Sequence, residues 1–412
     1  MEGRVGSSMT RDAARPLTPA RRPLATALLL AASIAATLAA FEAAARWVMR
    51  REGGAVFVAA SVEPDPILGW RHRPGARGAY GHGSWAINRR GLRDVERELA
   101  PAPGVQRALI LGDSFAEGFS VPFEACVSQV LERELRAEGC AAEVVNGGTV
   151  GYSTDQEYLF YRDEGARYGA RVVVLLVYHN DILYNARAAA PGGVAKPLFT
   201  FTGGVARVKN LPLPPPPPPA REGPRFWRGS AALTWVRQRL REGAPRTYDD
   251  LAKLRFWSAL DREPPLELRV FQRDPPEPMV QAWLQTEHLL RLLDAEVRRN
   301  GARLLVVYVP SKMEVDGGEW DRVRQRYGVD ERVWDRGRVA RLLEDAGRKG
   351  GFPVLDLTDA LWREASDTKR GVYHRGGGHW NEAGHAAAAH VIRRHVLDAG
   401  WLRCDRRSPG TR

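Results

Sequence analysis

Ser114 and His379 are the two residues of this chain whose types and surroundings point to nucleophilic chemistry. Ser114 follows the uncharged apolar run 108–111 by way of Gly112 and Asp113, and His379 stands just before an apolar helical segment. A serine acts as a nucleophile when a base within hydrogen-bond reach takes its proton, and histidine often serves as that base. The alternative is structural, because aspartate and serine often cap a turn. The sequence predicts acyl transfer if the fold brings the two residues together.

Acyl transfer also needs hydrogen-bond donors for the negative charge that develops on the carbonyl oxygen. The candidate donors are the backbone N–H groups of Ser114 and Gly151 and the side-chain amide of Asn180. Gly151 lies in a glycine-rich loop after the second apolar run, and Asn180 follows the third. We expect Asp113 to cap the turn that presents the serine, and Asp181 to fix the loop that carries Asn180.

Strand and helix patterns alternate along most of the chain. Apolar runs without charge predict strands buried on both faces, and apolar residues spaced by three and four predict helices. This alternation is typical of a parallel sheet covered by helices on both faces, a three-layer α/β/α fold. The carboxyl ends of parallel strands meet at one edge, so the candidate groups should form one site. The expected strands are 108–111, 143–146, 171–178, 303–309 and 352–357, and the expected helices are 123–138, 156–168, 279–300, 338–349 and 381–399.

Two segments break this alternation. Residues 52–106 are predicted to form an irregular amino-terminal extension, with several breaker residues in 63–70. Residues 186–278 interrupt the domain 107–400 as an insertion or lid. Its polyproline stretch at 211–219 should be extended and exposed. Two amphipathic pieces follow this stretch, at 231–241 and 248–260.

The amino terminus predicts a membrane anchor. The run from Pro23 to Phe41 holds 19 residues without a charge, close to the roughly 20 that span a bilayer. A cleaved signal peptide is the rival, although its apolar core usually has only about 7–15 residues. Arginines are more numerous before the run than after it, which favours a cytoplasmic amino terminus. We expect a cytoplasmic tail at 1–22, a transmembrane helix at 23–45, and a domain on the periplasmic side of the inner membrane.

The net charge and the cysteine content limit which partners and cofactors are expected. The formal net charge is +12, but the arginines are spread along the chain without interleaved aromatic residues, so no nucleic-acid partner is expected. Cys126, Cys140 and Cys404 fit no metal-ligand spacing, and no phosphate-binding glycine pattern occurs, so no metal or other cofactor is expected. Cys126 and Cys140 flank one expected helix and would stand about 20 Å apart, too far for a bridge. A Cys140–Cys404 disulfide is open if the domain lies outside the cytoplasm.

Four blocks of the sequence together resemble the SGNH/GDSL hydrolase superfamily. They are, in the family's order, Gly112-Asp113-Ser114, the glycine loop 146–154, the Asn180–Asp181 pair and the segment 379–385. More narrowly, the chain resembles bacterial membrane-anchored members related to the alginate-type O-acetyltransferase domains. This second resemblance is carried by the anchor with Glu42 and Arg46, the segment 88–94 and the stretch 154–157. The likeness covers about 65–181 and 279–399 and leaves out the proline-rich insertion.

The resemblance implies an ester hydrolase that works through an acyl-enzyme on acyl esters, O-acetyl esters included. Ser114 would be the nucleophile, His379 the general base, and Gly151 and Asn180 the oxyanion donors. One alternative is an O-acyltransferase of an envelope or exported polysaccharide, which differs only in the group that accepts the acyl chain. A second alternative is a catalytically weak SGNH-like module that binds carbohydrate.

One departure from the family pattern concerns the acid that orients the base. The family places an aspartate two or three residues before the histidine, whereas this chain has Gly377 and Gly376 there. Three outcomes are open. A backbone carbonyl orients His379, an acid from elsewhere such as Asp356 or Asp367 takes the role, or the site is weakened or inactive.

Four other polar residues receive mainly structural interpretations. We expect His385 to cap or pack the last helix, and His374 to be a loop residue that could substitute as the base. His179 is either a pocket wall or a satisfied polar residue. Lys312 is expected at the surface, with contact to an anionic substrate as the alternative.

Overall fold

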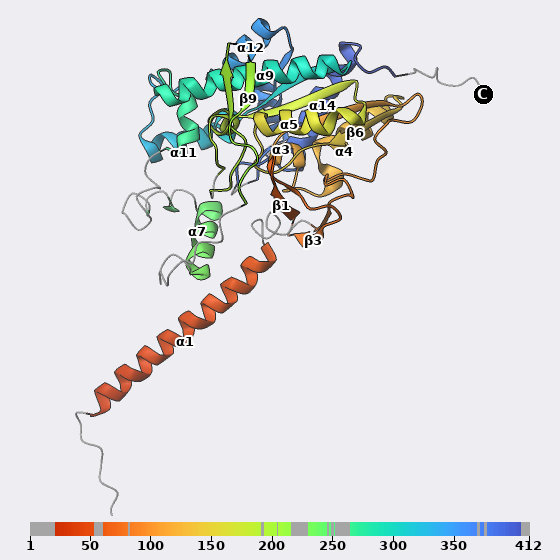
Figure 1. Cartoon of the computed structure of the whole chain (residues 1–412). Helices are drawn as coiled ribbons and strands as arrows, with labels where there is room; N and C mark the ends of the chain where they lie inside the picture. The colour runs from red at the N-terminus through yellow and green to blue at the C-terminus, as the bar shows by residue number, and fades with distance from the viewer. Residues whose placement is uncertain are drawn as a thin grey trace, which may run out of the picture. The chain divides into compact units, whose positions relative to one another are not determined.

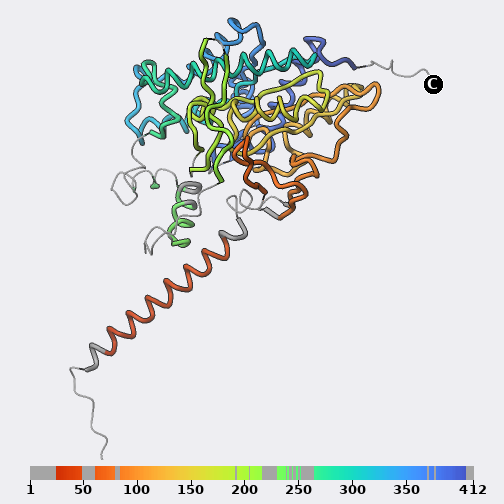
Figure 2. The backbone as a smooth tube through the Cα atoms, viewed as in Figure 1, coloured from red at the N-terminus to blue at the C-terminus, as the bar shows by residue number. Residues whose placement is uncertain are grey.

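The structure is a computed structural model that describes most of the 412 residues (Figures 1 and 2). Its described residues fall into two units, one within 1–50 and 224–236 and the other within 51–223 and 237–412. The described residues are 21–52, 61–80, 83–190, 193–203, 205–215, 230–244, 247, 248, 251, 264–368, 371–374 and 377–404.

A parallel five-stranded sheet forms the middle layer of the second unit. Its strand order is β11-β10-β7-β5-β6, and every neighbouring pair runs parallel. All five strands predicted from the sequence are present, each within two residues of its expected ends. The strands are β5 (Gln106–Leu111), β6 (Ala142–Asn146), β7 (Val172–Tyr178), β10 (Arg303–Val309) and β11 (Val354–Asp356).

Helices cover both faces of this sheet. Successive residues of a strand point to opposite faces, so in β5 Ala108 and Ile110 enter one core while Leu109 and Leu111 enter the other. In Figure 1 the long teal helix α9 crosses the upper part of the domain, and its buried residues share one core with those of α5. The predicted three-layer α/β/α fold is confirmed. The Leu109 face packs against α5 (Thr154–Asp163), α9 (Glu277–Arg299) and α12 (Arg338–Gly350), and the Ile110 face against α4 (Val127–Ala137), α13 (Thr358–Thr368) and α14 (Glu382–Asp398).

Several strand ends continue into short helices that the sequence pattern did not predict. α6 (His179–Asn185) begins directly after β7, where a polar loop was expected. The Asp181 carboxylate accepts the Tyr178 N–H at 2.9 Å and so caps this helix. α10 (Lys312–Val315) and α11 (Gly317–Tyr327) follow β10 in the same way. Polar residues after these strands therefore start helices.

The amino-terminal extension contains two hairpins, so the expectation of irregular chain at 63–70 is wrong. β1 (Val62–Asp65) pairs antiparallel with β2 (Gly69–His72), and β3 (Arg77–Tyr80) pairs with β4 (Gly83–Ala86). The first turn closes because Asp65 Oδ1 accepts the N–H groups of Ile67 and Leu68, each at 2.8 Å. A polar side chain thus outweighs the breaker residues on either side.

The insertion contributes a third hairpin and two helical pieces to the described chain. β8 (Phe199–Thr202) pairs with β9 (Val205–Val208), and η4 (Leu266–Phe271) is a 3₁₀ helix. α7 (Ala231–Gly243) matches the first expected amphipathic piece, whereas most of 248–260 and the prolines 216–219 lie outside the described residues. Leu213 within the polyproline stretch is buried, not exposed as expected, and its N–H donates to the Pro66 carbonyl at 2.8 Å.

The first unit contains one continuous helix, α1 (Arg21–Glu52), which is clear in Figure 1. Its stretch Ala25–Val48 is long and apolar enough to cross a membrane, and a signal sequence would satisfy the same criterion. Within this unit, Glu42 caps the start of α7: its carboxylate accepts the N–H groups of Ala231 and Ala232 at 2.9 and 3.0 Å. The boundaries expected at 22 and 45 remain predictions.

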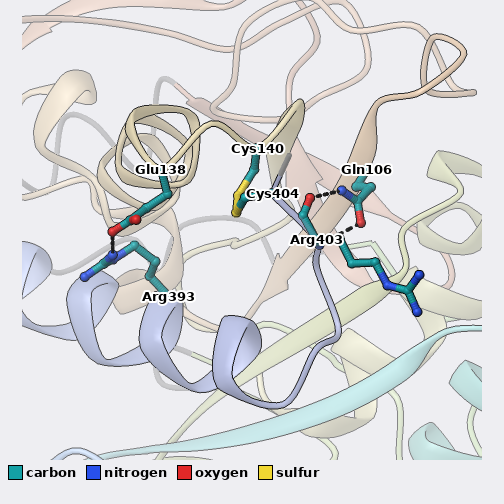
Figure 3. The surroundings of a disulfide bond; sticks show 6 residues. All are labelled: Gln106, Glu138, Cys140, Arg393, Arg403 and Cys404. Carbon is teal, nitrogen blue, oxygen red and sulfur yellow. Dashed lines mark hydrogen bonds and ion pairs between the residues drawn. A yellow bond between two sulfur atoms is a disulfide. The ribbon is translucent and has the colours of Figure 1, made fainter. Parts of the chain in front are cut away.

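A disulfide joins Cys140 to Cys404 across 264 residues of sequence (Figure 3). It ties the chain after α14 to the turn between α4 and β6. An ion pair between Arg393 and Glu138 lies beside it, and the Arg403 N–H donates to Gln106 Oε1 at 3.0 Å. The bridge left open by the sequence is therefore present.

Candidate active site

Ser114 is the first residue of α3 (Ser114–Glu117), a single helical turn at the end of β5. Asp113 caps this turn, because its Oδ1 accepts the Phe115 N–H at 2.9 Å. Gly112 links the strand to the cap with φ of 147°, and a Cβ there would lie 2.9 Å from the Ala116 Cβ. Only glycine fits at position 112, because its backbone conformation and the nearby Ala116 leave no room for a side chain.

The other end of α3 is held by a buried arginine, Arg93, whose role was not predicted from the sequence. The Arg93 guanidinium donates to the carbonyls of Glu117, Gly118 and Val121 at 2.9, 2.7 and 2.8 Å. Carbonyls at the end of a helix carry partial negative charge, so a cation placed there stabilises the turn. The arginine thus fixes the short helix that presents Ser114.

The structure brings Ser114 and His379 together. The Ser114 Oγ lies 2.8 Å from the His379 Nε2, although 265 residues separate them in sequence. His379 precedes α14, and its ring lies between two aromatic side chains, Phe115 and Phe119, at centroid distances of 5.2 and 5.1 Å. The pair has the geometry of a nucleophile and its base.

Burial holds His379 in its neutral form. Burial, and to a smaller extent the neighbouring His374, lowers the pKa of the imidazole to about 4. Within the described chain no carboxylate forms an ion pair or hydrogen bond with His379, and no carbonyl accepts from its Nδ1. Asp356 instead caps α13 by accepting the Thr358 N–H at 2.9 Å, and Asp367 is exposed on that helix. In the described chain, the ring is contacted by Phe115, Phe119 and the Ser114 hydroxyl.

The three candidate oxyanion donors share one property. In the described residues, none of the Ser114 N–H, the Gly151 N–H and the Asn180 amide donates a hydrogen bond. Gly151 has φ of 74° in the loop after β6, and Asn180 lies in the first turn of α6 with its Oδ1 buried. Both elements follow strands that neighbour β5 on either side. Unused donors at one sheet edge suit the stabilisation of an oxyanion.

Several buried ionisable groups lie next to the site. Burial raises the pKa of Asp113 to about 7 and raises that of Asp181 and Glu157 well above the usual range; the three carboxyl groups also repel one another. Next to them, Lys196 of the insertion is fully buried in an ion pair with Asp155, and its Nζ donates to the Tyr184 carbonyl at 2.9 Å. Neither Glu157 nor Lys196 was predicted from the sequence to lie beside the site.

A cleft of about 240 Å³ opens beside Gly378, the neighbour of His379. His179 lines it, with its ring packed 4.1 Å from that of Tyr178, as expected for a pocket wall. Lys312 also lines the cleft, but its Nζ donates to the His374 carbonyl at 3.1 Å, so it is not simply a surface residue. His385 packs edge-on against Trp380 at 5.5 Å, in agreement with a packing role. Among the described residues, no group of three or more potential ligands is placed to hold a metal ion.

Comparison with known families identifies the carboxyl-terminal part of the chain. Residues 274–407 match the family described as SGNH hydrolase-like domain, acetyltransferase AlgX. This part of the chain is therefore similar to the SGNH hydrolase-like domain of that family. The matched stretch runs from α9 to beyond α14 and contains His379 but not Ser114.

Solved structures similar to this chain include three acyl-ester hydrolases. A lipase/acylhydrolase from Enterococcus faecalis is 13% identical, with 73% of this chain and 99% of that chain covered and a TM-score of 0.37. The acetyl xylan esterase AlAXEase is 12% identical, with 70% and 99% covered and a TM-score of 0.37. A mutant of Axe2, an acetyl-xylooligosaccharide esterase from Geobacillus Stearmophilus, is 13% identical, with 71% and 94% covered and a TM-score of 0.37. No curated protein sequence matches this chain.

Proposed function

We propose that this SGNH protein is an ester hydrolase that works through an acyl-enzyme on Ser114. The Ser114 Oγ attacks the ester carbonyl carbon while the His379 Nε2 takes the hydroxyl proton. The bond to the leaving alcohol then breaks, and His379 returns that proton to the alcohol oxygen. Water releases the acid from the serine in a second step of the same form. The observation that carries the proposal is the 2.8 Å contact between Ser114 Oγ and His379 Nε2.

The unused donors support the same chemistry. During attack, the carbonyl oxygen gains negative charge, and the Ser114 N–H, Gly151 N–H and Asn180 amide have no protein acceptor to give up first within the described chain. His379 is neutral at physiological pH, as a base must be. A Ser-His dyad therefore suffices for the proposal, with Asp113 and Asp181 as supporting residues that cap α3 and α6.

Transfer of the acyl group to a carbohydrate hydroxyl is the second candidate. It uses the same first step and differs only in the acceptor that enters the second. The match to an acetyltransferase family favours it. In either case the substrate is an acyl ester, O-acetyl esters included, and carbohydrate is the proposed partner.

We place the catalytic domain outside the cytoplasm, anchored to the inner membrane by α1. The apolar stretch Ala25–Val48 is long enough for a single span. The Cys140–Cys404 disulfide supports an oxidising compartment, because such bonds are rare in the reducing cytosol. A carboxyl-terminal reporter should therefore be active only when it works outside the cytoplasm; activity confined to the cytoplasm would overturn the orientation.

The test is formation of an acyl-enzyme by the full-length protein in detergent. An activated acetyl ester should give a burst of alcohol, and mass spectrometry should place one acetyl group on Ser114. Ser114→Ala should abolish both signals and His379→Ala should slow them strongly, whereas Ser366→Ala, at an exposed serine of α13, should change neither. Absence of a burst together with glycan binding that survives both active-site substitutions would instead support a carbohydrate-binding module. Carbohydrate acceptors that accelerate turnover beyond hydrolysis would favour the transferase.

A further inference from the structure

The first amino-terminal hairpin touches the loop that carries Gly151. On strand β2, the Trp70 indole Nε1 donates to the Val150 carbonyl at 2.9 Å. The Tyr152 hydroxyl donates back to the Trp70 carbonyl at 2.7 Å, and the two rings lie 5.7 Å apart. The residues before and after Gly151 are therefore both fastened to one tryptophan.

The same residue, Val150, is held from its other side by the nucleophile helix. Its N–H donates to Glu117 Oε2 at 2.6 Å, and Glu117 is fully buried three residues after Ser114. The His72 Nε2, two residues beyond Trp70 on the hairpin, lies 3.4 Å from the same carboxylate oxygen. The hairpin, α3 and the loop after β6 thus form one connected group around Val150.

Because the peptide unit is planar, the hydrogen bond to the Val150 carbonyl also fixes the direction of the Gly151 N–H. The Val150 carbonyl and the Gly151 N–H belong to one planar trans peptide, in which the two groups point in opposite directions. A hydrogen bond that fixes the carbonyl toward Trp70 therefore fixes the N–H away from it. Gly151 itself has φ of 74° and no Cβ, so its own backbone would otherwise permit this peptide to rotate. Its N–H donates to no acceptor in the described residues.

We propose that Trp70 is a positioning residue that sets the oxyanion donor of this enzyme. This inference rests on the proposed function. It assigns to the hairpin that precedes the α/β core a part in the active site, because the donor keeps its direction only while the indole N–H holds the Val150 carbonyl. Trp70 does not touch the reacting atoms and acts through the Val150–Gly151 peptide.

The test compares Trp70→Phe with Arg71→Gln in the full-length protein. Phenylalanine keeps an aromatic ring but loses the indole donor, whereas Arg71 is an exposed neighbour on the same strand whose Nε pairs with Glu63 at 3.0 Å. Loss of one oxyanion donor costs about 10²- to 10³-fold in kcat. For a donor that is loosened but still present we expect a fall of roughly 10- to 100-fold in kcat with little change in KM. Arg71→Gln should stay close to wild type.

A second readout separates positioning from general loss of structure. A thiono ester places sulfur, a weak hydrogen-bond acceptor, where the oxyanion would form. The preference of the enzyme for the oxygen ester over its thiono analogue should therefore shrink in Trp70→Phe and persist in Arg71→Gln. An equal loss on both esters, or an unchanged acylation rate, would overturn the role of Trp70 while leaving the proposed function intact. No Ser114-dependent acylation in the wild type would instead mean that the proposed function has failed.

Discussion

Restoring the missing acid is the most direct test of how His379 works. The SGNH pattern that the sequence resembles has an aspartate two or three residues before its histidine, and Gly377 occupies the first of these positions before His379. A Cβ added at Gly377 would come no closer than 3.8 Å to the His374 Cβ and 4.0 Å to the His379 nitrogen of the backbone. Its φ does not lie in the left-handed region, so Gly377→Asp should fold normally.

The size of the effect follows from the pKa of the base. An opposite charge within about 4–6 Å raises the pKa of a histidine by about 1–3 units, and each unit corresponds to about 1.4 kcal/mol. Starting from about 4, the pKa of His379 should then reach about 5–7. If half of this interaction is present in the transition state, the barrier falls by roughly 0.7–2 kcal/mol, which is about a 3- to 30-fold gain in kcat.

The assay is the pH dependence of kcat/KM on an activated acetyl ester, with Gly377→Asn as the matched control. A base must be neutral to act, so activity is lost as the pH falls through the pKa of His379. Gly377→Asp should raise the rate at neutral pH and shift this acid limb to higher pH, and Gly377→Asn should do neither. An equal gain from asparagine would refute the electrostatic reasoning. A limb that moves without any gain in rate would show that ring orientation, not charge, limits the reaction.

Three further outcomes are expected. In the wild type, the acid limb of kcat/KM should lie near pH 4, because burial lowers the pKa of His379 to about 4; a limb near 6.5 would contradict the buried, neutral base. Replacing Cys140 and Cys404 by serine should reduce the free energy of unfolding by about 2–5 kcal/mol in urea titrations, since the bridge closes a loop of 264 residues; an unchanged midpoint would contradict this. Lys196→Met should cost about 3–5 kcal/mol by leaving the Asp155 carboxylate buried without its cation, and Lys196→Met with Asp155→Asn should recover most of it; equal losses in the single and double variants would refute the pairing.

The sheet could be predicted from the sequence because its strands are uncharged apolar runs that must be buried on both faces. A run such as Arg303–Val309 carries no charge after its first residue, and both faces must be covered. Convergence of Ser114 and His379 followed from the same topology, since both stand at carboxyl-edge positions of one parallel sheet. For the cysteines, helix length excluded only a Cys126–Cys140 bridge, and the Cys140–Cys404 disulfide stayed open until the structure showed it.

The surroundings of the site could not be predicted in the same way. The hydrogen bond from Trp70 to Val150 joins residues 80 apart, and no periodicity marks either of them. Lys196 looks like an ordinary surface lysine in sequence, yet it is fully buried because the insertion folds it against Asp155. The first turn of α6 was mistaken for a loop, because a strand followed by polar residues can continue into a helix when one of them caps it.

These contacts all hold the proposed site from outside the α/β core. The core that the sequence delimits begins at residue 107, but Arg93 fixes the far end of the helix that presents Ser114 from outside that core. Trp70 fixes the peptide that presents the Gly151 N–H, and Lys196 neutralises Asp155 at the base of α5 from within the insertion. A buried cation or donor cannot be removed without leaving its partners unsatisfied in a place that water does not reach. We infer that the extension and the insertion belong to the framework of the proposed active site, and that the α/β core alone would hold Ser114 and His379 without these supporting groups.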